Sequence, residues 1–310
     1  MSGSETAGGN KMEMQSNDLM SLDCCPACRS GDLVPSETIK KPYWLTYMRC
    51  RACNLMFMNP MPSQAWYDEF YRHAFWEGKA AANRKNELSA QLYKEADRAH
   101  AIVEFMQGAQ VSDGMVLEVG CAYGLLARSV AHRLGLEPAG IEPSDEARRF
   151  AEQHIRILGE TAADLANIDA NISLVILSNV LENIVDPETV LSTIRKRFGS
   201  YLIVVTPNPL RSRAVSLYHP FVYSAQAMER ALLWTGFDVL RYSLDPEDPQ
   251  AQMFFAAPSD GKLPLDLAQK FFVMRRKLGL YITKRKKRKK KRSLRLDDWD
   301  RQTIEKLLQS

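Results

Sequence analysis

The sequence contains no long apolar segment, and this absence excludes several classes of protein. No apolar run approaches the roughly 20 residues that a helix needs to cross a bilayer. The first twenty residues are rich in Ser, Gly, Asn and Met and lack the apolar core of a secretory signal. We therefore expect residues 1–20 to be disordered, the protein to be cytoplasmic, and its six cysteines to be reduced thiols rather than disulfides.

Acidic residues are absent from one stretch near the C-terminus. Thirteen basic residues and no acid lie between Arg275 and Arg295, and Lys284–Arg292 is an unbroken basic run. Apolar residues precede this run at the three- and four-residue spacing of one helix face; they are Leu267, Phe271, Met274, Leu278 and Ile282. An apolar helical face beside a basic run favours peripheral binding to an anionic membrane surface. RNA phosphates are the alternative partner, and a solvated, disordered tail is the simplest interpretation.

Four of the six cysteines form two closely spaced pairs. Cys25 and Cys28 are one Cys-x2-Cys pair, Cys50 and Cys53 are another, and 21 residues separate the two pairs. Two such pairs bring four thiolates to one tetrahedral point, which is the arrangement that Zn²⁺ prefers. Cys24 is adjacent but has the poorer spacing. The pattern predicts a structural zinc site within a small β-ribbon.

The most informative segment follows residue 114. An apolar run over 115–117 leads into Glu118 and a turn that contains Gly120 and Gly124. A helical pattern and a second apolar run follow, and that run ends on Glu142, 22 residues after Gly120. Glycines let a ligand approach the backbone closely, and an acid at the tip of the second strand can accept both hydroxyls of a ribose. The order of these features indicates a site for a nucleoside-type cofactor.

This segment resembles motifs I and II of the class I S-adenosylmethionine (SAM) methyltransferases. Motif I of that family is usually an acid followed by Gly-x-Gly-x-Gly, and Ala122 stands at the middle glycine here. The resemblance covers roughly residues 111–258. Later segments that resemble the same family are Ile172–Leu177 with Ser178–Pro187, Tyr201–Asn208, Trp234–Leu240 and Met253–Ala257.

The resemblance implies a role for individual residues. Glu118 would support the glycine turn and the methionine ammonium, Glu142 would hold the ribose, and Asp164 would bind the adenine amine. Asn179 and Val180 would face the methionine end of SAM and the acceptor. The other residues expected to line the cofactor are Gly120, Ala122, Gly124 and Pro143.

A methyl acceptor hydroxyl also needs a base within hydrogen-bond reach. His219 follows the fifth predicted strand, where substrate loops often lie, and its imidazole has a suitable pKa range. Tyr223 is the second candidate, although either residue is also compatible with a purely structural loop. Asn183 stands where related sequences often have histidine, so that position offers no base.

The expected fold is therefore α/β: a Rossmann-like class I methyltransferase sheet with a small N-terminal zinc-ribbon module and a basic C-terminal tail. The expected organisation is a disordered stretch over 1–20, a zinc ribbon over 21–62, a helical linker or cap over 63–110, a SAM-binding domain over 111–258 and an amphipathic, polybasic tail over 259–310. A length of 310 residues suits one large core and a small module.

Three functions remain open from the sequence. The paired cysteines followed by Asn59–Pro62 and Trp66–Tyr71 resemble the start of bacterial methyltransferases of sugar and polysaccharide biosynthesis. That resemblance implies a small-molecule or glycan acceptor, with a sugar hydroxyl as the expected target. A ribosomal or transfer RNA methyltransferase would instead use the basic tail on phosphates. A non-catalytic assembly protein that keeps the fold is the third hypothesis, and Asn183 is the feature that favours it.

Overall fold

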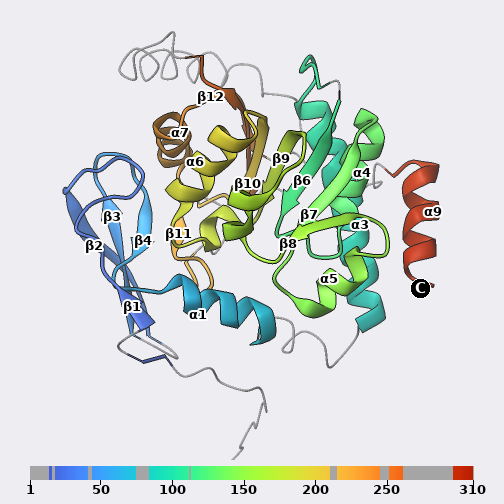
Figure 1. Ribbon diagram of the computed structural model, residues 1–310. Helices are drawn as coiled ribbons and strands as arrows, with labels where there is room; N and C mark the ends of the chain where they lie inside the picture. The colour runs from blue at the N-terminus through green and yellow to red at the C-terminus, as the bar shows by residue number, and fades with distance from the viewer. Residues whose placement is uncertain are drawn as a thin grey trace, which may run out of the picture.

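The computed structural model describes residues 14–15, 18–40, 44–74, 84–111, 113–209, 215–244, 251–260 and 296–309. A seven-stranded sheet forms the body, and a four-stranded sheet forms a smaller module beside it (Figure 1). The basic run Lys284–Arg292 and the apolar residues before it lie outside the described residues. Within the part of the chain that is described, no helix is both long and apolar enough to span a membrane.

The body is an open, mostly parallel sheet in the order β12-β13-β10-β9-β6-β7-β8. Five neighbouring strands are parallel, whereas β13 runs antiparallel to both β10 and β12. The predicted α/β class and the predicted antiparallel last strand are confirmed. The strands are β6 (Met115–Val119), β7 (Glu137–Ile141), β8 (Arg156–Gly159), β9 (Ile172–Ser178), β10 (Tyr201–Pro207), β12 (Phe237–Leu244) and β13 (Ala251–Pro258).

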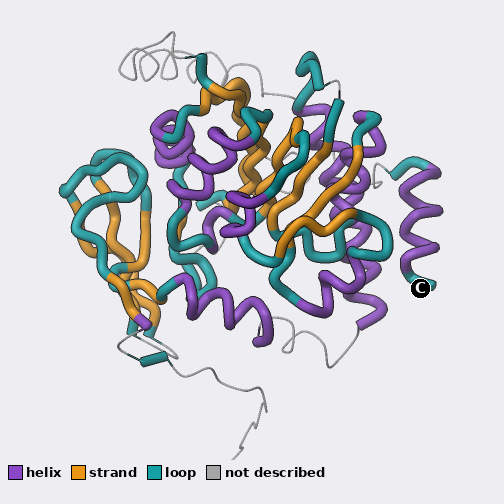
Figure 2. Tube along the Cα trace, in the orientation of Figure 1, coloured by secondary structure: helices purple, strands orange, loops and turns teal. Residues whose placement is uncertain are grey.

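Helices cover both faces of this sheet (Figure 2). Alternate residues of the central strands point to opposite faces. Val175 and Leu177 of β9 pack into one apolar cluster, and Leu174 and Ile176 pack into the other. Burial on both faces explains why β9 and β10 are continuous apolar runs rather than alternating ones. On one side lie α3 (Arg84–Phe105) and α4 (Leu125–Leu134); on the other lie η3 (Ala162–Asn167), α6 (Pro187–Arg197) and α7 (Ala225–Trp234), and α5 (Asp145–Ala151) follows β7.

The small module is not confined to the predicted range 21–62. Its sheet has the order β11-β4-β3-β2, and the body supplies β11 after the fifth parallel strand. A short pair of β1 with β5 completes it. A sequence-based boundary misses this pairing because β11 is only two residues long and about 160 residues away in the chain. The strands are β1 (Leu19–Met20), β2 (Leu33–Ile39), β3 (Leu45–Cys50), β4 (Met56–Met58), β5 (Met61–Pro62) and β11 (Phe221–Val222).

Two further helical pieces flank the body. Ser63 caps α1 (Gln64–Glu69), which continues into η2 (Phe70–Ala74). At the other end of the chain, α9 (Asp298–Leu307) packs against α3 (Figure 1). The side chains of Asp297 and Asp300 form a capping box at the N-terminus of α9.

Candidate functional site

The glycine turn between β6 and α4 is built around backbone in the left-handed region. Gly120 has φ +70° and Ala122 has φ +47°. A Cβ at Gly120 would lie 2.5 Å from Val180 Cγ2, so the loop after β9 packs directly on this glycine. The left-handed conformation of Ala122 costs roughly 1–2 kcal/mol that a glycine would not. The substitution in the motif is thus accommodated at a modest cost in conformational energy.

Glu142 holds this turn closed from the end of β7. Its carboxylate accepts hydrogen bonds from the backbone N–H of Ala122 at 2.8 Å and of Ser144 at 2.9 Å. The side chain is buried, and desolvation raises its pKa to about 7 despite these two hydrogen bonds. Because each carboxylate oxygen has two lone pairs, capacity remains to accept hydroxyl groups. Sequence reasoning did not predict the role in closing the turn.

A cavity of about 650 Å³ opens at the carboxyl ends of β6, β7 and β9. This volume falls within the roughly 300–1,000 Å³ of small-molecule and cofactor sites, and the position is where ligands bind in open α/β sheets. Most of the residues that the resemblance assigns to the cofactor line it. They are Glu118, Gly120, Ala122, Glu142, Pro143, Asn179 and Val180.

One wall of the cavity comes from α3 and was not predicted. Four polar residues of this helix line the cavity at the spacing of one helix face: Gln91, Lys94, Glu95 and Arg98. Arg98 donates a hydrogen bond to Ser178 Oγ at 3.1 Å. In sequence, such a polar face is typical of a solvated helix surface, and only the folded chain turns it toward the site.

A second unpredicted wall comes from α1 and η2. Gln64, Asp68 and Tyr71 line the cavity from this side. The Gln64 side-chain oxygen accepts from the Val185 N–H at 3.0 Å, which attaches α1 to the loop after β9. The residues of α1 and η2 that face the cavity are called the cap wall below: Gln64, Asp68 and Tyr71.

Two buried carboxyl groups lie side by side in the cavity. Glu118 is only 3% exposed, and its Oε2 accepts from the Ala127 N–H at 3.0 Å. Burial raises its pKa well above the usual range, and the neighbouring Glu95 adds to the rise. Burial likewise raises the pKa of Glu95 to about 7, and its Oε2 is enclosed with no hydrogen-bond partner among the described residues. With Arg98 beside them, these carboxyls match a ligand that carries both an ammonium and a carboxylate.

The loop after β9 forms a further wall of the cavity. Asn179 has φ +56°, and its backbone oxygen accepts from the Asn183 side chain at 3.0 Å. Asn183 lines the cavity, at the position where relatives often have histidine. The preceding residue, Glu182, is 1% exposed, and neither of its carboxyl oxygens makes a hydrogen bond among the described residues. This loop therefore places amides, not an imidazole, beside the cavity.

Two residues predicted to contact the cofactor do not line the cavity. Gly124 begins α4 with φ +78°, and a Cβ there would lie 2.7 Å from Ile155 Cδ1. Asp164 accepts from the backbone N–H groups of Glu160 and Thr161 at 2.8 and 2.9 Å and thereby caps η3. Gly124 thus packs against Ile155, and Asp164 caps η3 beside the cavity-lining residues Thr161 and Ala162.

The predicted bases, His219 and Tyr223, also lie outside the cavity lining. Tyr223 is 1% exposed and packs between the body and the small module. Burial raises the pKa of its phenol well above 10, so it cannot accept a proton near neutral pH. The His219 backbone oxygen accepts a hydrogen bond from the Tyr47 hydroxyl, which places His219 at the boundary with the small module. Neither candidate base therefore lines the cavity in this structure.

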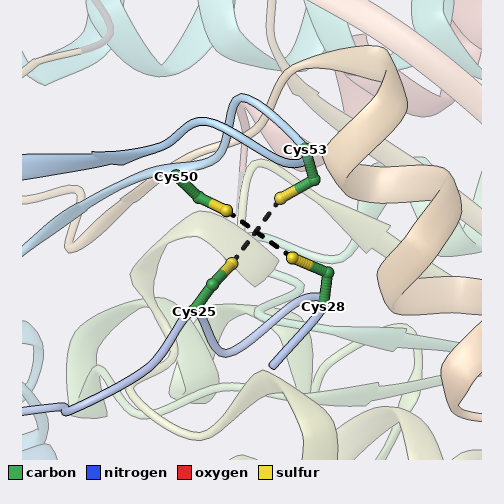
Figure 3. A group of neighbouring side chains, drawn as sticks. All are labelled: Cys25, Cys28, Cys50 and Cys53. Atoms are coloured by element: carbon green, nitrogen blue, oxygen red, sulfur yellow. Dashed lines mark hydrogen bonds between the residues drawn. The ribbon is translucent and has the colours of Figure 1, made fainter. Parts of the chain in front are cut away.

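The four predicted metal ligands come together in the small module (Figure 3). The sulfur atoms of Cys25, Cys28, Cys50 and Cys53 all lie within 4.8 Å of one another. The Sγ–Sγ distance is 3.6 Å for Cys25 with Cys53, and also for Cys28 with Cys50. A tetrahedron with Zn–S bonds of about 2.3 Å has S···S edges of about 3.8 Å. The donor set and its spacing fit a four-thiolate Zn²⁺ site.

Both cysteine turns have the same backbone shape. Arg29 follows the first pair and Asn54 follows the second, and each has φ +60°. Their N–H groups donate to the carbonyls of Cys25 and Cys50 at 2.8 Å. The hydrogen bond between Cys25 and Cys53 lowers the pKa of the Cys25 thiol and raises that of the Cys53 thiol, so the pair favours one negative charge shared between the two sulfur atoms. Cys24 is not part of the four-sulfur group.

Comparison with known proteins gives a consistent result for the body. A family model described as a methyltransferase domain matches residues 90–242. The ubiquinone biosynthesis O-methyltransferase of Rhizobium etli (strain CIAT 652) is 30% identical over 129 residues, which are 38% of this chain and 48% of that protein. The enzyme of the same name from Rhizobium rhizogenes (strain K84 / ATCC BAA-868) is 30% identical over 151 residues, 44% of this chain and 57% of that protein. The chain thus spans about half the length of the curated relatives it matches.

Solved structures with a related shape were also found. Magnesium protoporphyrin IX methyltransferase from Synechocystis PCC 6803, with bound SAH, has a TM-score of 0.48 and 13% identity over 64% of this chain and 100% of that chain. A SAM-dependent methyltransferase from Archaeoglobus fulgidus has a TM-score of 0.44 and 15% identity over 52% of this chain and 92% of that chain. The family model thus matches residues 90–242, just under half of the length of this protein, and the sheet of the body has a Rossmann-like α/β fold.

Proposed function

We propose that this protein is a SAM-dependent methyltransferase that acts on a small-molecule or glycan acceptor, with a hydroxyl oxygen as the methylated atom. The observation that carries the proposal is the cavity at the carboxyl ends of β6, β7 and β9, lined by the glycine turn and by Glu142. The matching family model supports the reaction class. The names of the matched relatives, ubiquinone biosynthesis O-methyltransferases, favour oxygen as the acceptor atom.

The residues present fit SAM on three counts. Backbone at Gly120 approaches the cavity where a side chain would collide with Val180. Glu142 presents a carboxylate for the ribose hydroxyls. Glu118, Glu95 and Arg98 offer both charge signs for the zwitterionic amino-acid end.

Bound SAM would supply a sulfonium methyl group for in-line displacement by the acceptor. The chain's own contribution is to orient the acceptor toward the methyl group and to exclude water. Orientation of this kind can lower the barrier by several kcal/mol. The cap wall and the polar face of α3 also line the cavity. Their amide, carboxylate and ammonium groups favour a polar acceptor, such as a sugar hydroxyl.

The cysteine module is proposed to hold one structural Zn²⁺ through Cys25, Cys28, Cys50 and Cys53. Four thiolates leave no open coordination position, so the metal would stabilise the fold and take no part in chemistry. Metal analysis of the purified protein should give one zinc per chain, and Cys50→Ser should lose it.

The basic run Lys284–Arg292 is proposed to bind an anionic partner, either the surface of a membrane or RNA. Only its sequence supports this part of the proposal, since the run lies outside the described residues. Transfer from methyl-labelled SAM into a fractionated cell extract separates the acceptors. Label in the lipid or polysaccharide fraction supports a glycan acceptor, whereas label in RNA supports the alternative function.

Cofactor binding is tested first by thermal unfolding with and without SAM. SAM should raise the melting temperature of the wild type and raise that of Glu142→Gln much less. Glu152→Gln, an exposed glutamate at the end of α5, is the matched control and should respond like the wild type. An equal response of Glu142→Gln and wild type would remove the ribose assignment, and no response of the wild type would remove SAM itself.

A further inference from the structure

A short loop after β10 is held by three tyrosine hydroxyls from the N-terminal part of the chain. The loop covers residues 215–220, and four consecutive backbone carbonyls of it, 216–219, accept these bonds. One tyrosine lies in β3, one in α1 and one in η2. The pairs are Tyr47 with Ser216 at 2.9 Å and also with His219, Tyr67 with Leu217 at 2.8 Å, and Tyr71 with Tyr218 at 3.1 Å.

These hydroxyls are well suited to a permanent structural contact. Tyr47 and Tyr67 are fully buried side chains. Burial raises the pKa of both phenols, and of Tyr71, above the usual range, so all three remain neutral donors at working pH. The part-buried carbonyls of Ser216, Leu217 and His219 would otherwise lack these partners, which is costly.

The same three tyrosines connect the small module to the cavity. Tyr71 belongs to the cap wall, whose other end is attached to the loop after β9 through Gln64 and Val185. Aromatic stacking continues this contact, since Phe70 stacks on Trp66 at 5.5 Å between ring centroids and on Tyr218 at 5.1 Å. The cap wall therefore lies between two loops that leave the carboxyl ends of the central strands.

The cysteine cluster is joined to the same loop. Met58 of β4 donates its N–H to the Pro220 carbonyl at 2.9 Å, and β4 then pairs with β11. Ser224, the N-cap of α7, donates its hydroxyl to the carbonyl of Cys53 at 3.0 Å. The cysteine turn, the 215–220 loop and the cap wall thus form one packed unit.

The cofactor end of the cavity is held by different contacts. The glycine turn and Glu142 bond to each other and stand on β6 and β7, two neighbouring parallel strands. None of the three tyrosines takes part in those bonds. Loosening the cysteine module should therefore leave the cofactor end in place.

We propose that the cysteine module is a working part of the acceptor site: through Tyr47, Tyr67 and Tyr71 it positions the cap wall against which the methyl acceptor binds. The three tyrosines are positioning residues and not catalytic ones. The inference rests on the proposed methyltransferase function and on the proposed metal site. It assigns the module to acceptor binding rather than to recruitment of a separate partner.

The test uses the full-length protein and the variant Tyr67→Phe, which deletes one hydroxyl and keeps the ring. Tyr201→Phe, at a partly buried tyrosine of β10 in the other apolar cluster, is the matched control. Loss of one buried hydrogen bond should speed amide exchange in residues 64–74 and 215–222 by about 5–10-fold. Exchange in 115–143 and the SAM dissociation constant should change by less than about 2-fold.

Methyl transfer into the acceptor-containing extract fraction gives the functional readout. In a dilution series of that fraction, Tyr67→Phe should need about 5-fold more extract for half-maximal transfer, with a nearly unchanged maximal rate. Removal of metal with a chelator should produce the same pattern more strongly. If Tyr67→Phe does not fold, Tyr47→Phe in β3, outside the cap wall, is measured in the same way.

The outcomes separate the two proposals. Absence of SAM binding in the wild type would overturn the proposed function. If the wild type binds SAM but Tyr67→Phe shows unchanged amide exchange in residues 64–74, the inference alone is overturned. The same holds if Tyr67→Phe loses SAM affinity in parallel with acceptor transfer.

Discussion

We expect Glu182→Gln to make the protein more stable at alkaline pH, because the carboxyl that it removes is buried without a hydrogen bond. Glu182 is 1% exposed, and neither oxygen has a partner among the described residues. Desolvation raises its pKa from 4.5 to about 8, and the nearby Thr206 hydroxyl and Arg98 offset this only in part. Folding therefore favours the neutral acid.

The sign and size of the effect follow from linkage. A carboxyl whose pKa is raised by folding contributes stability that is complete below about 4.5 and is lost as the pH rises through about 8. Since a difference of one in pKa corresponds to about 1.4 kcal/mol, ionised Glu182 costs the folded state up to about 5 kcal/mol at pH 9. Water entry and local relaxation reduce this to about 2–5 kcal/mol. The glutamine amide has its own desolvation cost of about 1–3 kcal/mol, but that cost does not change with pH.

Urea unfolding at pH 5.5 and pH 9 measures the effect. About 1.4 kcal/mol of the effect is already lost at pH 5.5, so the free energy of unfolding of Glu182→Gln, relative to the wild type, should rise by about 1–3 kcal/mol between the two pH values. The exposed Glu152→Gln should show no such change. A pH-independent difference for Glu182→Gln would refute the reasoning, because the carboxyl would then be ionised at little cost in the folded protein.

Two further predictions concern packing around the site. Asp300 is fully buried and accepts from Arg133 at 2.7 Å, so Asp300→Ala should cost about 2–4 kcal/mol and release α9 to proteolysis, whereas Asp298→Ala on the exposed side of that helix should not. Limited proteolysis with mass spectrometry checks this, and a protected α9 in Asp300→Ala would contradict it. Gly120→Ala should cost about 1–3 kcal/mol because its Cβ would meet Val180 at 2.5 Å in a left-handed conformation. Val180→Ala should restore part of that loss in a double-mutant cycle, and strictly additive losses would show that the contact is not the cause.

The body of the fold was predictable because its signals are local. The apolar runs of β9 and β10, the turn at Gly120 and the acid at Glu142 each occupy a short stretch of chain. The four-cysteine cluster was predictable for the same reason, since two residues separate the cysteines of each pair. In every case the chemistry needs residues at a defined spacing along one element.

The predicted site residues that do not line the cavity share a different cause. His219 and Tyr223 were chosen because they follow the fifth strand, but three tyrosines from the N-terminal part turn that loop toward the small module. Asp164 has the residue type that adenine binding needs, yet its carboxylate accepts a hydrogen bond from the Thr161 N–H at 2.9 Å. Position after a strand does not determine which way a side chain points.

The sequence by itself determined the fold class, through the order of strand, glycine turn, helix and acid. It also identified the two cysteine pairs. Only the tertiary structure decided what lines the cavity, because Gln64 and Tyr71 come from one helical segment and Glu95 and Arg98 from another. It also decided that β11 of the body completes the sheet of the small module. The physical reason is that long-range packing and strand pairing depend on which apolar faces meet, and spacing along the chain does not record that.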